Sequence, residues 1–119
     1  MYIVVLGISH QTASVEVREK LSFSERQLIP ALGRLLTHQE ILEGVILSTC
    51  NRTEIYALAT DLDVARELLV KFWMTEKKCP REVMDSYSYF YQLDDALRHL
   101  HRVTAGVDSL IIGEGQILA

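Results

Sequence analysis

The sequence predicts one mixed α/β domain of the α+β type, and three observations support that fold class. The chain has 119 residues, the size of a single domain. It is 49% hydrophobic and 24% charged, a balance typical of globular proteins that bury a core. Runs of β-branched and apolar residues alternate with segments in which leucines recur at helical spacing. Strands and helices are therefore expected to share one core.

The first part of the chain predicts a strand, a helix and a second strand. Residues 3–8 form a continuous apolar run, which is typical of a buried strand. Ser22 and Ser24 each offer a capping box with the residue three positions later, and leucines follow at helical spacing. Pro30 removes one backbone bond, so we expect a turn first and the regular helix from about Pro30. Residues 45–48 predict the second strand, and no element is assigned between the first strand and Ser22.

The second part predicts two more strands, each followed by a helix. The expected elements are a strand at residues 54–60, a helix at 64–74, a strand at 87–91 and a helix from Asp94 or Asp95 to about Ala105. Asp61 and Asp63 are the candidate N-caps of the first of these helices. The second strand reads YSYFY, and aromatic residues favour strands. Gly106 is expected to end the last helix.

The predicted order of elements is β-α-β-β-α-β-α. Its first six elements match the ferredoxin-like plan, in which two helices cover one face of a four-stranded sheet. We therefore expect a ferredoxin-like βαββαβ sandwich with an additional C-terminal helix, in one domain over residues 1–119. The last residues, GEGQILA, break off within an apolar run. We expect the natural protein to continue beyond Ala119, with the start of a linker helix at this end.

Composition excludes several classes of function. A formal net charge of -4 argues against a broad basic surface for nucleic acid. Two cysteines are too few for a disulfide scaffold, and no Cys/His spacing typical of a zinc site occurs. No apolar run approaches the roughly 18 residues of a membrane span. The N-terminus reads as a strand and lacks the basic region of a secretory leader. A cytoplasmic protein with free thiols is expected.

Cys50 lies in the segment VILSTCNRTEIY, between two apolar runs, and it has two readings. A cysteine at the end of an apolar strand is usually a small buried residue. However, the polar residues 51–54 cannot all be buried cheaply, so Cys50 is expected where the chain reaches the surface. Arg52 would then favour the thiolate form. Cys79 has neighbouring lysines, which would also lower a thiol pKa, but no group nearby that could bind a substrate.

Other chemistry-bearing residues give weaker signals. His10 follows the first strand, where it could satisfy a backbone group or line the same rim as Cys50. His99 falls at the edge of the apolar face of the last predicted helix, and His101 points elsewhere because successive helical residues are about 100° apart. The segment GVDSLIIGEGQIL is rich in glycine but is not a GxGxxG or P-loop motif, so it favours a helix end and a turn.

Three stretches together resemble the N-terminal catalytic domain of glutamyl-tRNA reductase. They are GISHQTASVEVREKL, ILSTCNRTEIY and LHRVTAGVDSLIIGEGQIL, which cover most of the chain in the same order as in that family. The resemblance implies reduction of glutamyl-tRNA(Glu) by NADPH to glutamate-1-semialdehyde through a cysteine thioester. That reaction opens tetrapyrrole (5-aminolevulinate) biosynthesis. The physical logic is that a thioester keeps the acyl group activated and tethered, which splits one difficult step into two.

The resemblance also assigns roles to residues. It implies that Cys50 is the nucleophile and that His99 is the activity-linked histidine beside it. It further implies a glutamyl pocket, to which the following residues contribute: Thr49, Asn51, Arg52, Ser109, Glu114 and Gln116. Arg52 suits a substrate carboxylate because its planar guanidinium can bind both oxygens. His10 and Thr12 are assigned only to the surroundings of the site.

The same resemblance has departures and further implications. Ser14 and Gly115 stand where many family members have proline. Family members continue into a Rossmann-type NADPH domain and a helical dimerisation domain, neither of which this chain contains, so no cofactor-binding residue is assigned here. The implied partners are glutamyl-tRNA(Glu), chiefly its aminoacyl end, and a second copy of the full-length protein in a homodimer. Glutamate-1-semialdehyde aminomutase is the implied channelling partner, and no membrane is involved.

Two other classes of function stay open on the residues alone. One is a ferredoxin-like ligand-binding or regulatory module in which Cys50 is structural. The other is an RNA-binding module that uses aromatic residues on an open face of the sheet. The YSYFY strand supplies aromatic residues for it, but the negative net charge counts against it.

Overall fold

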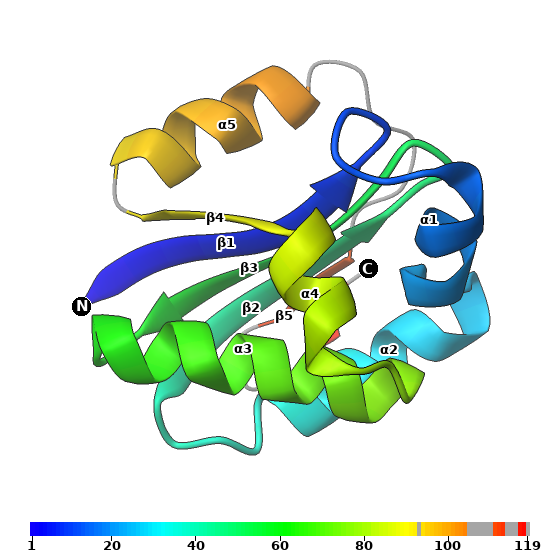
Figure 1. Cartoon of the computed structure of the whole chain (residues 1–119). Coiled ribbons are helices and arrows are strands. Elements are labelled where there is room, and N and C mark those ends of the chain that lie inside the picture. Colours follow the sequence, from blue (N-terminus) through cyan, green and yellow to red (C-terminus); the bar gives the residue numbers. More distant parts are fainter. Residues whose placement is uncertain (93, 105–110, 114–116, 119) are drawn as a thin grey trace.

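A computed structural model describes residues 1–92, 94–104, 111–113 and 117–118 (Figure 1). Its strands are β1 (Tyr2–Ser9), β2 (Ile41–Ser48), β3 (Arg52–Ala59), β4 (Tyr89–Gln92), β5 (Ile111–Gly113) and β6 (Ile117–Leu118). Its helices are α1 (Val15–Leu21), α2 (Glu25–Leu35), α3 (Leu62–Lys77), α4 (Arg81–Tyr87) and α5 (Asp94–Thr104).

The strands form one sheet in the order β4-β1-β3-β2-β5-β6, and the described pairings are antiparallel. The first four strands have the order of the ferredoxin-like fold, which confirms the predicted α+β architecture. The helix after β4 is also confirmed. The described parts of the C-terminal segment form short strands, β5 and β6, where a helix end and a turn were expected. Strand β5 pairs with β2 and extends the sheet beyond the four strands of the ferredoxin-like plan, on the side of β2.

Helices cover the two faces of the sheet unequally. Alternate residues of a strand point to opposite faces, so β1 sends Val4, Leu6 and Ile8 to one side and Val5 to the other. The first side is the main core, with residues from α1 to α4 that include Leu21, Leu32, Trp73 and Met84. The second side is a small cluster of Val5, Tyr56 and Ala96, where α5 packs. Figure 1 shows α5 across the sheet from α3 and α4.

The helices around Ser22 and Ser24 agree only partly with the prediction. Helix α2 is regular from Glu25, with Pro30 inside it, so the expected start near Pro30 is wrong. Pro30 and Arg26 are both exposed, so water can satisfy the carbonyl that loses its helical partner. The Ser24 capping box is supported, because the Gln27 side chain accepts a hydrogen bond from the Ser24 amide at 3.0 Å. Ser22 instead ends α1, a helix that was not predicted.

Tertiary packing explains why α1 and α4, two short helices that were not predicted from the sequence, form in the structure. Helices α1 and α4 each have seven residues, too few for a clear 3.6-residue period, and each buries one side chain: Leu21 in α1 and Met84 in α4. The Trp73 indole of α3 donates a 3.0 Å hydrogen bond to the Leu21 carbonyl, which fixes the end of α1 against the core. Helix α4 takes up Tyr87, so the aromatic strand begins at Tyr89.

Candidate functional site

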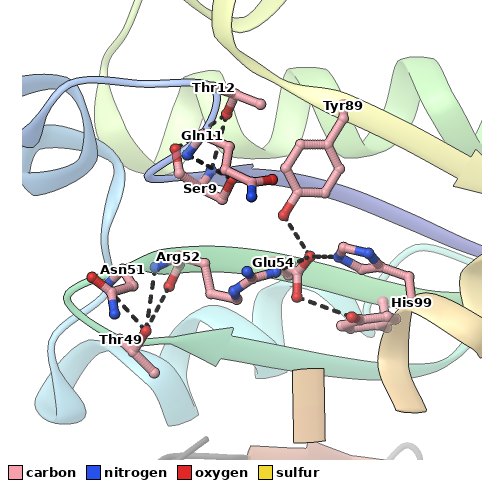
Figure 2. Close-up of polar contacts among 10 residues, drawn as sticks. Ser9, Gln11, Thr12, Thr49, Asn51, Arg52, Glu54, Tyr89 and His99 are labelled. Atoms are coloured by element: carbon pink, nitrogen blue, oxygen red, sulfur yellow. Dashed lines mark hydrogen bonds and ion pairs between the residues drawn. The ribbon is translucent and has the colours of Figure 1, made fainter. Parts of the chain in front are cut away.

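Cys50 lies in the tight turn that joins β2 to β3, and its side chain is exposed. Thr49 organises this turn. Its Oγ1 accepts hydrogen bonds from the amides of Asn51 and Arg52, both at 3.2 Å, and its own amide donates to the Arg52 carbonyl at 2.7 Å (Figure 2). The turn therefore holds the thiol outside the core, and the reading of Cys50 as a buried packing residue is wrong.

A second loop, after β1, supports the turn from the side. The His10 amide donates to the Asn51 carbonyl at 2.8 Å. The Arg18 guanidinium bridges the two segments, because it donates to the Cys50 carbonyl at 3.2 Å and to the Ala13 carbonyl at 2.7 Å. These hydrogen bonds hold the backbone of Cys50 and Asn51 and do not involve the Cys50 thiol.

A pocket of about 510 Å³ opens beside Cys50. Its lining comes from the end of β1 and the loop after it, the β2–β3 turn, the start of β3, β4 and α5. The lining residues are Ser9, His10, Gln11, Thr12, Thr49, Cys50, Asn51, Arg52, Tyr89, Tyr91, His99, Arg102 and Val103. The pocket brings together five of the residues assigned from the sequence: Thr49, Cys50, Asn51, Arg52 and His99. His10 and Thr12 also line it. Ser109, Glu114 and Gln116 lie outside the described residues.

Glu54 lies beneath this pocket, and its side chain is wholly buried. Residues 51–54 are not all buried, as expected: Asn51 is exposed and Arg52 is half-buried, whereas Thr53 and Glu54 are buried. Thr53 is accommodated by a 3.0 Å hydrogen bond between its hydroxyl and that of Ser48. Glu54 is accommodated by hydroxyl donors: Tyr56 donates to Oε1 at 2.9 Å and Tyr89 to Oε2 at 2.5 Å.

The two tyrosines are held in the protonated, donating form. Burial raises the pKa of Tyr56 and of Tyr89 far above the ordinary value, and the nearby Glu54 charge and hydrogen bond raise both pKa values further. Each hydroxyl therefore remains a donor to the carboxylate across the physiological pH range.

His99 reaches this cluster from α5. Its Nε2 is hydrogen-bonded to Glu54 Oε2. Its ring packs against the adjacent rings of Tyr89 and Tyr91, with centroid distances of 5.4 Å to Tyr89 and 5.2 Å to Tyr91. Figure 2 shows the Tyr89 hydroxyl and the His99 ring both directed at the Glu54 carboxylate. The Arg52 guanidinium lies 3.7 Å from the same Oε2. The thiol, the imidazole and the guanidinium therefore share one pocket.

Cys79 contrasts with Cys50. It is half-buried against the core after α3, where burial raises the pKa of its thiol. The expected lowering of this pKa by lysines is therefore wrong in direction. Among the residues described, no group of three or more His, Cys, Asp or Glu side chains could hold a metal ion. Cys50 is the better placed of the two thiols for chemistry.

Comparison with known proteins agrees with this geometry. Residues 6–119 match the family model described as the N-terminal domain of Glutamyl-tRNAGlu reductase. The chain belongs to the glutamyl-tRNA reductase family. It is 48% identical over 118 residues to the glutamyl-tRNA reductase of Carboxydothermus hydrogenoformans, which covers 99% of this chain and 26% of that protein.

Two further glutamyl-tRNA reductases extend the comparison. That of Synechococcus sp. (strain CC9311) is 45% identical over 119 residues, covering 100% of this chain and 27% of the relative. The solved structure of the Methanopyrus kandleri enzyme has a TM-score of 0.60 and 28% identity, over 90% of this chain and 23% of that one. The chain thus spans about a quarter of the length of the curated relatives it matches. No helix in the described part of the chain is long and apolar enough to cross a membrane.

Sequence reasoning missed several residues of the site. Glu54 belongs to the STCNRTEIY block, but its burial depends on strands that are distant in sequence. Tyr89 and Tyr91 were assigned to a strand, and their i, i+2 spacing could have placed both on one face. Arg102 lies three residues after His99, which places both on the same side of a helix. The alternation in YSYFY was the strongest signal available.

Proposed function

We propose that this chain is the acyl-transfer domain of an NADPH-dependent glutamyl-tRNA reductase. It takes the glutamyl group from its tRNA onto Cys50, and reduction of the resulting thioester gives glutamate-1-semialdehyde for tetrapyrrole biosynthesis. One observation carries the proposal: an exposed thiol, held by a hydrogen-bonded turn, shares a pocket with an imidazole and a guanidinium. Membership of the family supports the same reaction.

The first step is an exchange of an oxygen ester for a thioester. The Cys50 sulfur attacks the carbonyl carbon of the glutamyl ester, and a C–S bond forms as the C–O bond to the ribose breaks. The thiol proton leaves the sulfur, and the ribose oxygen departs as a hydroxyl, so the step needs no oxidant or reductant. His99, in the same pocket, is the group suited to accept the thiol proton.

Recognition of the glutamyl group is assigned to the residues around the thiol. The Arg52 guanidinium binds the side-chain carboxylate of the substrate, while Thr49 and Asn51 shape the turn beside it. The Arg52 side chain is 20% exposed, so it is accessible from the pocket although Glu54 lies on its other side. Ser109, Glu114 and Gln116 remain predicted members of the same pocket.

The described residues do not fit the NADPH that supplies the hydride. A dinucleotide fold uses parallel strands and a glycine-rich βα turn, whereas the sheet pairings described here are antiparallel. We therefore derive no hydride step from these residues and assign the cofactor to another domain. A homodimer of the full-length protein and channelling to glutamate-1-semialdehyde aminomutase likewise stay predictions.

The test compares the two cysteines. We expect Cys50→Ser to abolish semialdehyde formation in a full-length reductase that carries this chain as its N-terminal domain. Serine is a weaker nucleophile, and its ester accepts hydride less readily. Cys79→Ser is the matched control, and we expect it to keep activity within about twofold, as for a side chain away from the reacting atoms. Normal reduction by Cys50→Ser would refute the proposed role of this site.

A further inference from the structure

Glu54 has no role in the acyl transfer described above, yet several side chains bind its carboxylate. A buried carboxylate is costly unless it is paired and hydrogen-bonded. Glu54 has no exposed surface, and its contacts come from three elements: β3, β4 and α5. Side-chain packing alone would be served as well by an apolar residue of similar volume. The carboxylate therefore needs a functional explanation.

Residues of three strands make room for this carboxylate. In the sheet, Gly7 of β1 lies directly between Glu54 of β3 and Tyr89 of β4. A Cβ atom at position 7 would lie 2.8 Å from Glu54 Cγ and 2.8 Å from the ring and hydroxyl of Tyr89, closer than real Cβ contacts allow. Glycine at this position is what permits the Glu54–Tyr89 hydrogen bond to pass over β1.

The donors around Glu54 are not equivalent. Tyr56 and Tyr89 come from the sheet itself and hold the carboxylate in place. His99 comes from α5, and its Nε2 shares Oε2 with the Tyr89 hydroxyl. The nearest Arg52 nitrogen is 3.7 Å from that oxygen, beyond a hydrogen bond. Of His99 and Arg52, the imidazole is therefore the group that is hydrogen-bonded to Glu54.

This contact fixes the proton on the imidazole. To bond an ionised carboxylate, Nε2 must carry the hydrogen, so a neutral ring keeps its lone pair on Nδ1. Among the described residues, Nδ1 makes no protein hydrogen bond, and the His99 side chain lines the Cys50 pocket. A base with its lone pair free and its other nitrogen held by a carboxylate is the arrangement by which histidines activate nucleophiles in other enzymes.

We propose that Glu54 is a positioning residue for acyl transfer: it holds His99 through Nε2–H and so leaves Nδ1 as the acceptor of the Cys50 proton. This inference rests on the proposed function. When the thiol proton moves to Nδ1 and sulfur attacks the ester carbonyl, the positive charge on the ring is paired with Glu54. Tyr56 and Tyr89 keep the carboxylate stationary while that charge forms.

The kinetic test is a double-mutant cycle on single-turnover acylation of Cys50 by glutamyl-tRNA. We expect Glu54→Gln to lower the rate constant by about 10- to 100-fold, at the low end of losses from general-base catalysis, because it keeps the shape but removes the charge. The tRNA concentration giving half the maximal rate should change by less than about threefold, since Glu54 does not touch the substrate. Glu43→Gln, at an exposed position of β2, is the matched control.

The cycle is completed in the His99→Asn background. If Glu54 acts through His99, then Glu54→Gln should slow acylation there by no more than about threefold, because coupled residues are non-additive. Full additivity of the two losses would overturn the proposal, as would an unchanged rate in Glu54→Gln alone.

A second readout does not depend on turnover. Nitrogen NMR of the histidine-labelled wild-type chain reports which ring nitrogen of His99 carries the proton. We expect a proton on Nε2, and we expect Gly7→Ala, which displaces the carboxylate, to weaken that preference. A proton on Nδ1 in the wild type would overturn the inference. Absence of Cys50 acylation in the wild type would instead contradict the proposed function, and the tautomer would still decide whether Glu54 orients His99.

Discussion

Arg52 has two negative partners to consider, one inside the protein and one in the substrate. Its guanidinium lies 3.7 Å from Glu54 Oε2 and is partly exposed to the pocket. Glu54 already accepts three hydrogen bonds from Tyr56, Tyr89 and His99. The N–H groups of Arg52 are therefore not hydrogen-bonded to Glu54 and can donate to both oxygens of a substrate carboxylate.

A substitution that keeps the positive charge of Arg52 should still weaken recognition of the glutamyl group. We expect Arg52→Lys to weaken transition-state binding by about 1–3 kcal/mol, because lysine lacks the planar fork that binds two oxygens. The measurement is kcat/KM for glutamyl-tRNA. Arg26→Lys, at an exposed position of α2, is the control and should match the wild type. A wild-type kcat/KM for Arg52→Lys would show that Arg52 does not hold the substrate.

The residues of the site differ in how far the sequence could predict them. Cys50, Thr49, Asn51 and Arg52 are contiguous, so a local motif was enough to place them together. Glu54 was missed because its partners come from β4 and α5, at positions 89 and 99, and only the register of three strands brings them together. The residues next to Glu54 in the sequence do not show that distant hydrogen-bond donors lower the free-energy cost of burying its carboxylate.

Element ends decide where these side chains lie. Strand β2 stops at Ser48 and β3 starts at Arg52, so only three residues form the turn that presents Cys50. On α5, Ala96 and Val103 are buried, while Leu97 is 47% exposed. With this orientation of α5, His99 faces the sheet. This agrees with its predicted position at the edge of the apolar face of the helix. The side chain of His101 lies outside the described residues.

Helix α3 allows a test of capping at the scale of one element. The sequence left Asp61 and Asp63 as alternatives, and the structure favours Asp61, whose Oδ1 accepts a 3.0 Å hydrogen bond from the Val64 amide. We expect Asp61→Ala to lower the free energy of unfolding by about 1 kcal/mol. We expect Asp63→Ala to cost about 0.3–1 kcal/mol, since it loses only a favourable charge in the first turn.

Urea unfolding of the two variants makes this measurement, with the wild type alongside. A larger loss for Asp63→Ala than for Asp61→Ala would mean that α3 begins at a different residue.

The length of an element decides whether the sequence can predict it. The order of the longer elements could be predicted from their hydrophobic patterns. Helices α1 and α4 could not, because each is short and is held by one side chain buried in the main core, Leu21 in α1 and Met84 in α4.

For the whole molecule, the two faces of the sheet have separate roles. The face under α1–α4 contains the main core, and the face under α5 carries the buried Glu54 cluster and one wall of the Cys50 pocket. An open sheet face for RNA, as one alternative required, is therefore not available around β4, because α5 packs there and Tyr89 and Tyr91 contact His99. The fold stabilises a site rather than a flat binding surface.

This arrangement predicts a half-reaction for the 119-residue chain on its own. The described residues include the proposed acyl-transfer site and no dinucleotide fold. The thioester should therefore be hydrolysed slowly by water, which closure of a second domain would otherwise exclude. We expect slow release of free glutamate from glutamyl-tRNA and no semialdehyde at saturating NADPH. Both products are followed in parallel, with Cys50→Ala as the blank. Semialdehyde from this chain would show that our assignment of the cofactor to another domain is wrong.

Peptide mass spectrometry can show whether Cys50 itself carries the glutamyl group. The chain is mixed with glutamyl-tRNA, quenched with acid and digested so that the peptides containing Cys50 and Cys79 are resolved. We expect one glutamyl adduct, on the Cys50 peptide of the wild type, and we expect hydroxylamine to remove it. The Cys50→Ser variant should form no thioester adduct. An adduct on Cys79, or none on either peptide while glutamate is released, would contradict the assignment of the glutamyl group to Cys50.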